Sequence, residues 1–199
     1  HLVPPFPVRS PDISAEKSPG LNILYVGNVI SQKGLHVLLK ALVRMEQGCF
    51  KLTIAGRLDM EPVYVKQIRR QIKCSHLEQS IQVTGPLNGS ELTACYLEND
   101  ILVLPSVNEA YGIVYIEAQG FGIPVIGTLA GGATEIIQHG ENGYLIKPGD
   151  SKTLSELLTT LNNDRDRLKL MGSKARDYYQ QHPTWDDSCA KIRDFLIRT

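Results

Sequence analysis

Hydrophobic and polar positions follow two different periods along the chain. Short runs of consecutive apolar residues, most of which end at Gly or Pro, alternate with stretches in which Leu or Ile recurs every three to four residues. The short runs are typical of buried parallel strands, and the longer stretches are typical of the helices that connect them. Strands are predicted at 22–26, 50–55, 81–83, 101–104, 124–126 and 144–146.

Helices are predicted between these strands and after the last one. Ser90 is expected to cap the helix that contains Tyr96, Asp150 the helix at 154–161, and Thr184 a final helix at 185–197. The pattern as a whole predicts an α/β fold, namely a doubly wound, Rossmann-like, mostly parallel sheet of about six strands with flanking helices. In such a sheet the loops after Val26, Leu104 and Ile126 should meet at one edge, where ligands bind. The other expected helices cover 35–42, 63–72, 112–121, 133–138 and 168–171.

Proline marks the start of the chain. The first twenty residues contain Pro4, Pro5, Pro7, Pro11 and Pro19, a density that disfavours both helix and sheet. We expect residues 1–20 to form a lead-in or linker and residues 21–199 to form one folded domain. A chain that starts on such a tether is expected to be part of a longer protein.

Composition gives no overall electrostatic argument for nucleic-acid or membrane binding, and no signal for a metal site. Lys plus Arg and Asp plus Glu are equal at 21 each, so no overall field attracts nucleic acid or an anionic membrane, although a local cationic cluster could still bind phosphate. The four Cys and five His residues lack metal-ligand spacing, which predicts no metal site and reduced thiols in a cytoplasmic protein. We expect neither a transmembrane segment nor a signal peptide.

The first candidate loop, Gly27–Gly34, follows the first predicted strand. Its glycines and the following helix would present backbone N–H groups and the positive end of a helix dipole, both of which suit phosphate. Lys33 adds a full positive charge, and Gly27 and Asn28 lie at the start of the loop. Taken alone, Lys33 could also be an ordinary solvated lysine.

The second candidate loop carries two glutamates eight positions apart. Glu109 precedes a helix expected to open at Gly112, and Glu117 lies less than two turns inside that helix. The free N–H groups of Gly112, Ile113 and Val114 would face a ligand between the two carboxylates. A spacing of eight alone is weak, because acids near a helix start also stabilise its dipole.

Paired glycines, Gly131 and Gly132, form the third candidate loop, where they would permit close approach of the backbone to a ligand. Glu135 follows them. It could belong to the site, or it could simply be an acid in the first turn of a helix that stabilises the helix dipole.

These loops together resemble the C-terminal domain of the retaining, GT-B-fold glycosyltransferases called group 1. The resemblance covers about residues 21–197. It rests on the lysine loop, the Glu-x7-Glu motif at 109–117, Gly-Ile-Pro-Val at 122–125, Gly-Gly-x-x-Glu at 131–135, Asn-Gly-x-Leu at 142–145, and Trp185 at the opening of the last helix. It implies that residues 21–199 form a nucleotide-sugar-binding domain, that an N-terminal acceptor-binding domain is missing from this chain, and that no metal or other cofactor is needed.

The resemblance also assigns roles to residues. Glu117 corresponds to the residue that accepts hydrogen bonds from the ribose, Glu109 to the one that contacts the transferred sugar, and Lys33 to the one that neutralises the diphosphate. Tyr111, Gly112 and Ile113 would direct backbone N–H groups at the sugar and phosphate. Glu109 and Lys33 are accordingly the expected catalytic residues, and Leu87 lies in the segment expected beside the base.

The sequence departs from the family at Asn28, where an arginine is usual, and this departure leaves diphosphate affinity in question. A non-catalytic module of the same fold therefore stays open as an alternative. A nucleotide-sugar epimerase of the same fold is a further alternative, although it should not need the Glu-x7-Glu spacing. A dinucleotide oxidoreductase is disfavoured because no G-x-G-x-x-G motif follows the first strand.

Overall fold

The computed structural model describes residues 20–182 together with 189 and 193. Six strands form one parallel sheet: β1 (Leu21–Val26), β2 (Phe50–Ala55), β3 (Ile81–Gly85), β4 (Ile101–Val103), β5 (Val125–Thr128) and β6 (Gly143–Ile146). The helices are α1 (Leu35–Leu42), α2 (Pro62–Cys74), α3 (Gly89–Glu98), α4 (Ile113–Gly120), α5 (Ala133–Ile136), α6 (Ser151–Asn163) and α7 (Arg165–Gln181). Two 3-10 turns, η1 (Ser31–Lys33) and η2 (Glu78–Ser80), precede α1 and β3. The predicted fold class is confirmed.

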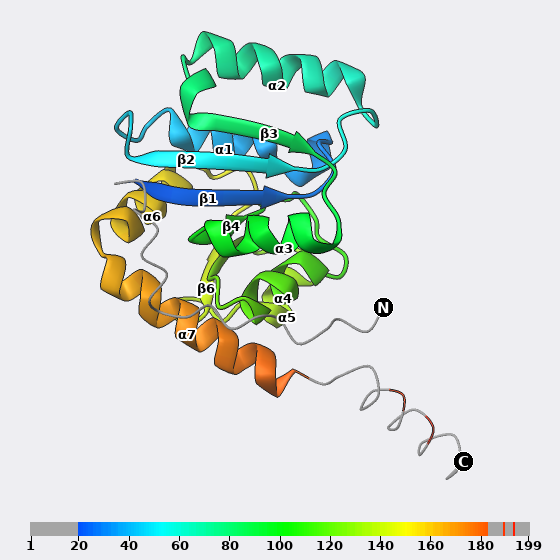
Figure 1. Ribbon diagram of the computed structural model, residues 1–199, viewed down its shortest axis with the longest axis vertical. Coiled ribbons are helices and arrows are strands. Elements are labelled where there is room, and N and C mark those ends of the chain that lie inside the picture. Colours follow the sequence, from blue (N-terminus) through cyan, green and yellow to red (C-terminus); the bar gives the residue numbers. More distant parts are fainter. Residues whose placement is uncertain (1–19, 183–188, 190–192, 194–199) are drawn as a thin grey trace.

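The strand order is β3-β2-β1-β4-β5-β6, so the sheet is wound outward in both directions from the β1/β4 boundary. Figure 1 shows α1 and α6 behind the strands, α3 and α4 in front of them, and α2 above the edge strand β3. Because β1 and β4 lead to helices on opposite faces, the topological switch point lies between these two strands at the carboxyl edge of the sheet, where sheets of this kind bind ligands. We call this edge the rim.

The core consists of apolar side chains from both halves of the sheet. All three residues of β4 and most residues of β1 are buried, as runs of consecutive apolar residues predict for strands covered on both faces. The α6 and α7 helices close the back and lower side of the domain (Figure 1), with Leu154, Leu158 and Leu161 of α6 buried against it.

Helix caps agree with the sequence at one position and differ at another. Asp150 accepts a hydrogen bond from the Thr153 backbone N–H and caps α6, as predicted. The prediction for Ser90 is wrong: α3 begins at Gly89, Asn88 occupies the N-cap position, and no side chain caps the helix. The final helix predicted at 185–197, with its Thr184 cap and Trp185, lies outside the described residues.

Candidate functional site

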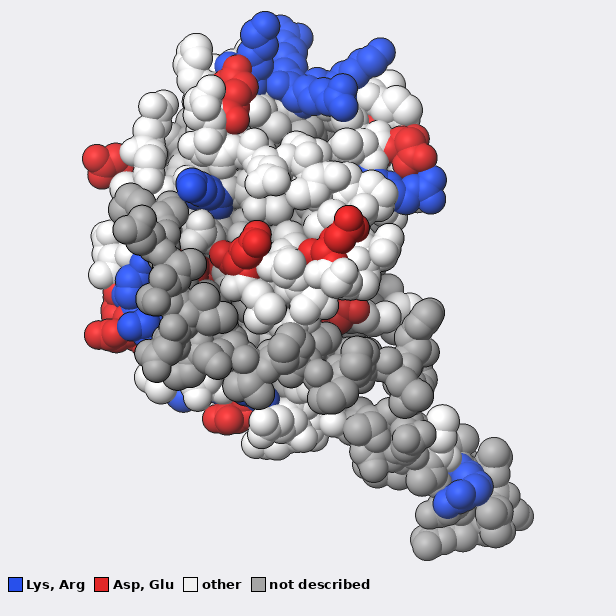
Figure 2. All heavy atoms as spheres, viewed as in Figure 1, with Lys and Arg blue, Asp and Glu red and all other residues white. Residues whose placement is uncertain are grey.

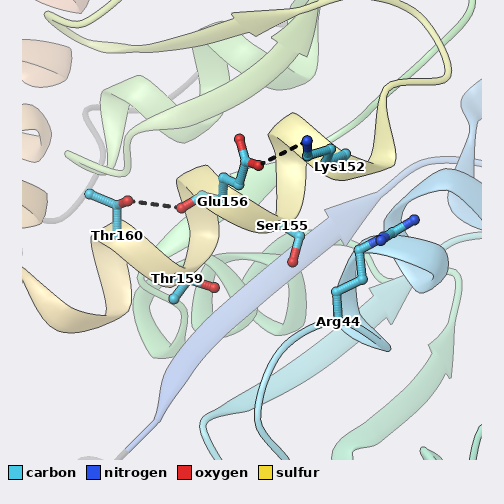
Figure 3. Close-up of a pocket in the computed structure, with 6 residues that line it drawn as sticks. All are labelled: Arg44, Lys152, Ser155, Glu156, Thr159 and Thr160. Carbon is cyan, nitrogen blue, oxygen red and sulfur yellow. Dashed lines mark hydrogen bonds and ion pairs between the residues drawn. The ribbon is translucent and has the colours of Figure 1, made fainter.

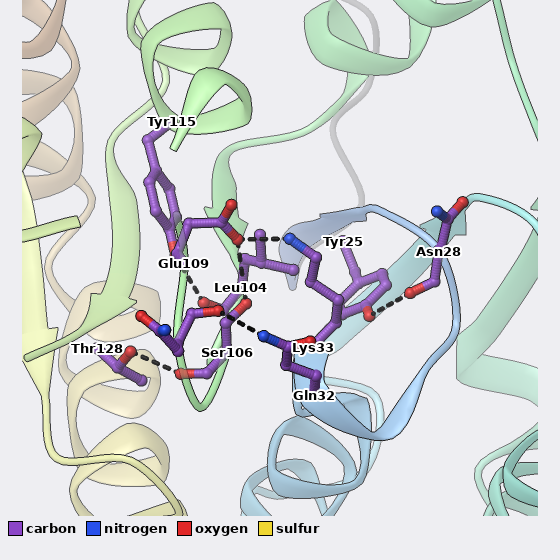
Figure 4. A network of polar contacts seen from close by, with 10 residues as sticks. Tyr25, Asn28, Gln32, Lys33, Leu104, Ser106, Glu109, Tyr115 and Thr128 are labelled. Carbon is purple, nitrogen blue, oxygen red and sulfur yellow. Dashed lines mark hydrogen bonds and ion pairs between the residues drawn. The ribbon is translucent and has the colours of Figure 1, made fainter. Parts of the chain in front are cut away.

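Hydrogen bonds join the three candidate loops at the rim. The Val107 backbone N–H donates to the Gln32 carbonyl oxygen at 2.8 Å, which links the loop after β1 to the loop after β4. Thr128 Oγ1 donates to the Ser106 carbonyl oxygen at 2.6 Å, which links β5 to the same loop. Figure 4 shows the contact between Thr128 and Ser106, with Gln32 and Lys33 of the first loop beside the second loop. The expectation that the three loops meet on one edge is confirmed.

Gly34 allows the first two loops to approach each other closely. Its φ is +72°, and a Cβ atom at this position would lie 2.0 Å from the Pro105 carbonyl oxygen. A side chain would therefore clash with backbone that cannot rotate away, in a conformation that L residues already disfavour. Glycine here brings the preceding residue, Lys33, within reach of the loop after β4.

Lys33 and Glu109 form the centre of the site. Lys33 Nζ lies 2.6 Å from Glu109 Oε2, and Ser106 Oγ donates to the same carboxylate oxygen at 3.3 Å. The Lys33 side chain is 24% exposed and the Glu109 side chain 12%. The pair is screened less than a surface ion pair, but an ammonium and a carboxylate edge remain within reach of a ligand (Figure 4).

The amino end of α4 borders this pair. Gly112 is the N-cap residue, with a φ of +66°, and a Cβ atom there would lie 2.6 Å from Ile136 Cδ1. The first N–H groups of the helix, those of Ile113 and Val114, have no acceptor within it and suit an anionic or hydroxyl ligand. Tyr111 is 80% exposed just before the helix, so its ring is free to contact a ligand.

Glu117 is fixed by a different contact. Its Oε2 accepts a hydrogen bond of 2.9 Å from Tyr96 Oη of α3, and the Tyr96 ring stacks on Phe121 with centroids 4.8 Å apart. Burial raises the pKa of Tyr96 well above its ordinary value, and the negative charge of Glu117 raises it further. The structure thus pairs Lys33 with Glu109 but brings neither into contact with Glu117, which belongs to a second group at the front of the sheet.

The start of the first loop holds the departure from the family pattern. The Gly27 backbone N–H donates to the Ala55 carbonyl oxygen, and the Asn28 carbonyl oxygen accepts from Tyr25 Oη at 3.3 Å. The neighbouring cation, Arg57, is held by Asp59 through bonds of 3.0 and 2.8 Å. The two side chains form an exposed ion pair, 58% and 67% exposed.

Two buried tyrosines lie beneath the Lys33–Glu109 pair. Tyr115 Oη donates to the Leu104 carbonyl oxygen at 2.8 Å. Burial raises the pKa of both Tyr25 and Tyr115, and the Glu109 charge adds to each shift. Both phenols therefore stay protonated at neutral pH and act as hydrogen-bond donors that hold the loop backbone in place.

The remaining candidates lie farther along the rim. Leu87 follows β3, which is the edge strand at the opposite end of the strand order from β6, and its half-buried side chain packs against the core. Gly131 approaches Glu109, because the next residue, Gly132, donates its backbone N–H to the Glu109 carbonyl oxygen at 2.6 Å. Glu135 is an exposed first-turn acid of α5.

A separate hollow of about 440 Å³ lies away from the rim. It is bordered by α6 and by the segment after α1 (Figure 3), and its lining residues are Arg44, Lys152, Ser155, Glu156, Thr159 and Thr160. None of the candidate residues borders it. Among the residues that the structure describes, no cluster of His, Cys, Asp or Glu is arranged to hold a metal ion.

Sequence reasoning missed three positioning residues. Ser106 and Tyr96 bind the two motif glutamates, and Glu61 Oε2 accepts from the Ser31 backbone N–H at 3.0 Å, which ties the start of α2 to the first loop. A signal was available only for Ser106, since a serine directly after an apolar strand and a proline is unusual. Glu61 and Tyr96 meet partners 30 and 21 positions away, which no local pattern reveals.

Comparison with solved structures agrees with this geometry. Anabaena HepE in complex with UDP superposes with a TM-score of 0.84 at 26% sequence identity, over 92% of this chain and 50% of that one. The crystal structure of a C-terminal domain of a group 1 glycosyl transferase, LpcC of Francisella tularensis, gives a TM-score of 0.75 at 25% identity, over 83% and 87% of the two chains.

Curated relatives point the same way. An uncharacterized glycosyltransferase of Methanocaldococcus jannaschii is 32% identical over 83% of this chain and 42% of its own length. A GDP-mannose-dependent phosphatidylinositol monomannoside mannosyltransferase of Mycobacterium tuberculosis is 27% identical over 87% of this chain and 46% of its own length. The chain thus spans about half the length of these relatives.

The family model for group 1 glycosyl transferases matches residues 9–178, which is most of the chain. Within the described residues, no helix is both long and apolar enough to cross a membrane. On the match, the fold and the relatives together, the chain belongs to the group 1 glycosyl transferases.

Proposed function

We propose that this chain binds a nucleoside-diphosphate sugar at the rim and supplies the donor half of a retaining glycosyltransferase. The observation that carries the proposal is the Lys33–Glu109 pair at the β1/β4 boundary, beside the amino end of α4. A diphosphate needs a cation and free N–H groups, and the transferred sugar needs a carboxylate that accepts hydroxyl hydrogen bonds. The cation and the carboxylate are in contact at 2.6 Å, and α4 begins four residues after Glu109.

Transfer breaks the bond between the anomeric carbon and the diphosphate, so negative charge grows on the departing oxygens. Lys33 and the N–H groups of Ile113 and Val114 would stabilise that charge without covalent chemistry. Glu109, within contact of Lys33, would orient the sugar. Glu117, held by Tyr96, would accept hydrogen bonds from the ribose. No metal ion has a part in this scheme.

The relatives support a nucleoside diphosphate but differ in the base. HepE has been solved with UDP and with UDP-glucose, whereas the mycobacterial relative uses GDP-mannose. Calorimetry with UDP, GDP and ADP is the direct test, with affinities expected in the micromolar to millimolar range. Lys33→Ala should weaken the best ligand about tenfold, because it removes a charged contact to phosphate.

A matched control comes from Lys51, an exposed lysine near the amino end of β2, away from the rim. Lys51→Ala removes the same charge from the chain and should leave the affinity unchanged. Equal affinities for wild type and Lys33→Ala would remove Lys33 from the site and end the proposal in this form.

One observation favours a second candidate, a non-catalytic module of the same fold. Asn28 stands where the family usually has arginine, Arg57 is paired with Asp59, and Lys33 is paired with Glu109. A module of this kind would bind none of the three diphosphates up to millimolar concentration, whereas a donor domain would bind at least one and lose affinity on Glu117→Ala.

A further inference from the structure

Helix α2 carries a line of positive charge on its exposed side. Lys66, Arg69, Arg70 and Lys73 are all exposed, whereas Tyr64, Val65 and Ile68 face the core. The four cations occupy positions i, i+3, i+4 and i+7, so they form one stripe along the helix. Figure 2 shows Lys and Arg gathered over α2 at the top of the molecule. We call this set the cationic stripe.

The cationic stripe has no counter-charge of its own. Residues 62–74 contain no Asp or Glu, and none of the ion pairs recorded among the described residues involves a stripe residue. Like charges three and four positions apart destabilise a helix. The chain as a whole is neutral, so the stripe is a local excess of positive charge. The repulsion between its four cations is not offset by acidic residues of α2.

Exposed apolar side chains continue the line of the stripe. Val63 is 71% exposed and lies one turn before Lys66 on the same side of α2, and Met60, 52% exposed, lies two residues before the helix. Cations next to exposed apolar groups are typical of helices that lie in a membrane interface. A nucleic acid backbone or an acidic peptide would pair with the cations but would leave the valine and methionine in water.

The orientation of α2 connects this surface to the site. Glu61 precedes the helix and accepts a hydrogen bond from Ser31 in the loop after β1. The amino end of α2, with Val63 and Met60, therefore lies at the rim. A partner that binds the exposed side of α2 would lie beside the candidate site.

We propose that the cationic stripe, together with Val63 and Met60, binds peripherally to a bilayer that contains anionic headgroups. The inference stands independently of the donor site. Each cation near such a surface contributes about fivefold to the partition coefficient, and the attraction weakens as salt rises. Four cations together predict binding that depends on both lipid charge and ionic strength.

The test is co-sedimentation of the 199-residue chain with vesicles of phosphatidylcholine alone or with 30 mol% phosphatidylglycerol (roughly a third anionic). Wild type should bind only the anionic vesicles and should be released at high salt. A variant with Gln at all four stripe positions should lose roughly 600-fold in partition coefficient. Because the substitutions relieve like-charge repulsion on an exposed face, α2 should stay folded, which circular dichroism checks.

A matched control carries Gln at four exposed lysines elsewhere, namely Lys51, Lys147, Lys152 and Lys169, which lowers the net charge by the same amount. It should keep most of the binding.

Val63→Ser should weaken binding while keeping every charge. Equal binding by the stripe variant and the control, binding to neutral vesicles, or no binding at all would overturn the proposal. Tighter binding to a DNA duplex than to anionic vesicles at the same salt would also overturn it, in favour of nucleic acid.

Discussion

Lys33 and Glu109 are 76 positions apart in the sequence, yet Nζ of one lies 2.6 Å from Oε2 of the other, across the boundary between the two halves of the sheet. The cation that should receive a diphosphate is therefore already bound to a carboxylate of the same site. A phosphate group that enters the rim has to share Lys33 with Glu109 or displace it. The effects of substitutions at the two positions follow from this competition.

We expect substitutions at these two positions to act in opposite directions on diphosphate binding. Glu109→Gln removes a negative charge and frees Lys33, so it should tighten binding of a nucleoside diphosphate about three- to tenfold. Lys33→Ala should weaken it about tenfold. Calorimetry at low and high salt measures the diphosphate affinity of both variants. If both substitutions raised the affinity, or both lowered it, Glu109 and the diphosphate would not be competing for Lys33.

The double variant serves as the control for this prediction. In the Lys33→Ala background, Glu109→Gln removes the repulsion between the carboxylate and the diphosphate but has no lysine to release. The gain in diphosphate affinity from Glu109→Gln should therefore be smaller than in the wild-type background. Fully additive effects would show that the two side chains act on the ligand separately.

Tyr96→Phe tests the support of Glu117. The ring keeps its stacking on Phe121, whereas the carboxylate loses its 2.9 Å hydrogen bond. We expect a loss of about 1 kcal/mol in the free energy of unfolding and a weakening of donor binding by a few-fold. Urea denaturation and calorimetry on the same sample separate the two effects. Unchanged affinity would mean that Glu117 does not depend on Tyr96 for its position.

Gly34→Ala and Gly149→Ala form a matched pair for the close approach at the rim. Both glycines have positive φ, +72° and +80°, so each substitution should cost about 1–2 kcal/mol from backbone strain alone. Only at Gly34 does a Cβ atom also meet backbone, and the clash should add about 1–3 kcal/mol and disturb Lys33. Equal urea midpoints for the two variants would contradict this account.

Asn28→Arg restores the cation that the family usually has. We expect tighter diphosphate binding with a steeper salt dependence, because a second positive charge joins Lys33. Arg57→Ala should change little, since Asp59 holds that guanidinium. An unaltered affinity on Asn28→Arg would indicate that this position does not face the diphosphate.

The 199-residue chain should bind a donor without transferring its sugar. Its relatives are about twice as long, and positioning an acceptor beside the anomeric carbon can account for roughly 7–11 kcal/mol of a barrier. We expect at most slow hydrolysis of the donor, measured by mass spectrometry with a panel of acceptors. Efficient product formation would place the acceptor site within this chain.

The strands were predictable because each is a short apolar run that ends at a turn residue, and their observed bounds differ from the predicted ones by no more than two residues. The order of the strands was not predicted, because pairing of β1 with β4 depends on contacts between distant segments. The error at Ser90 has a similar origin. Residue type indicates that a helix starts nearby, but the turn through Asn88 and Gly89 decides where it does.

The candidate residues were identified by motif, whereas their grouping was not. Lys33 and Glu109 were both singled out, but nothing local in the sequence pairs them. Tyr96 appeared as one more residue on a helix, although its hydroxyl binds a motif glutamate 21 positions later. Side-chain contacts between elements that meet only in the folded sheet are the part of a site that a single sequence leaves open.

The position of β3 at the end of the strand order has a consequence for behaviour at high concentration. Among the residues that the structure describes, no strand pairs with the outer side of β3, and Gln82 and Val83 of this strand are exposed. Such an edge is a template for pairing between copies of a chain. Two copies that approached through β3 would also bring their two α2 helices together. The cationic stripes on these helices would repel each other, although each protein as a whole has zero net charge. The same cations would thus keep the protein colloidally stable in solution, and light scattering should show earlier self-association once they are neutralised.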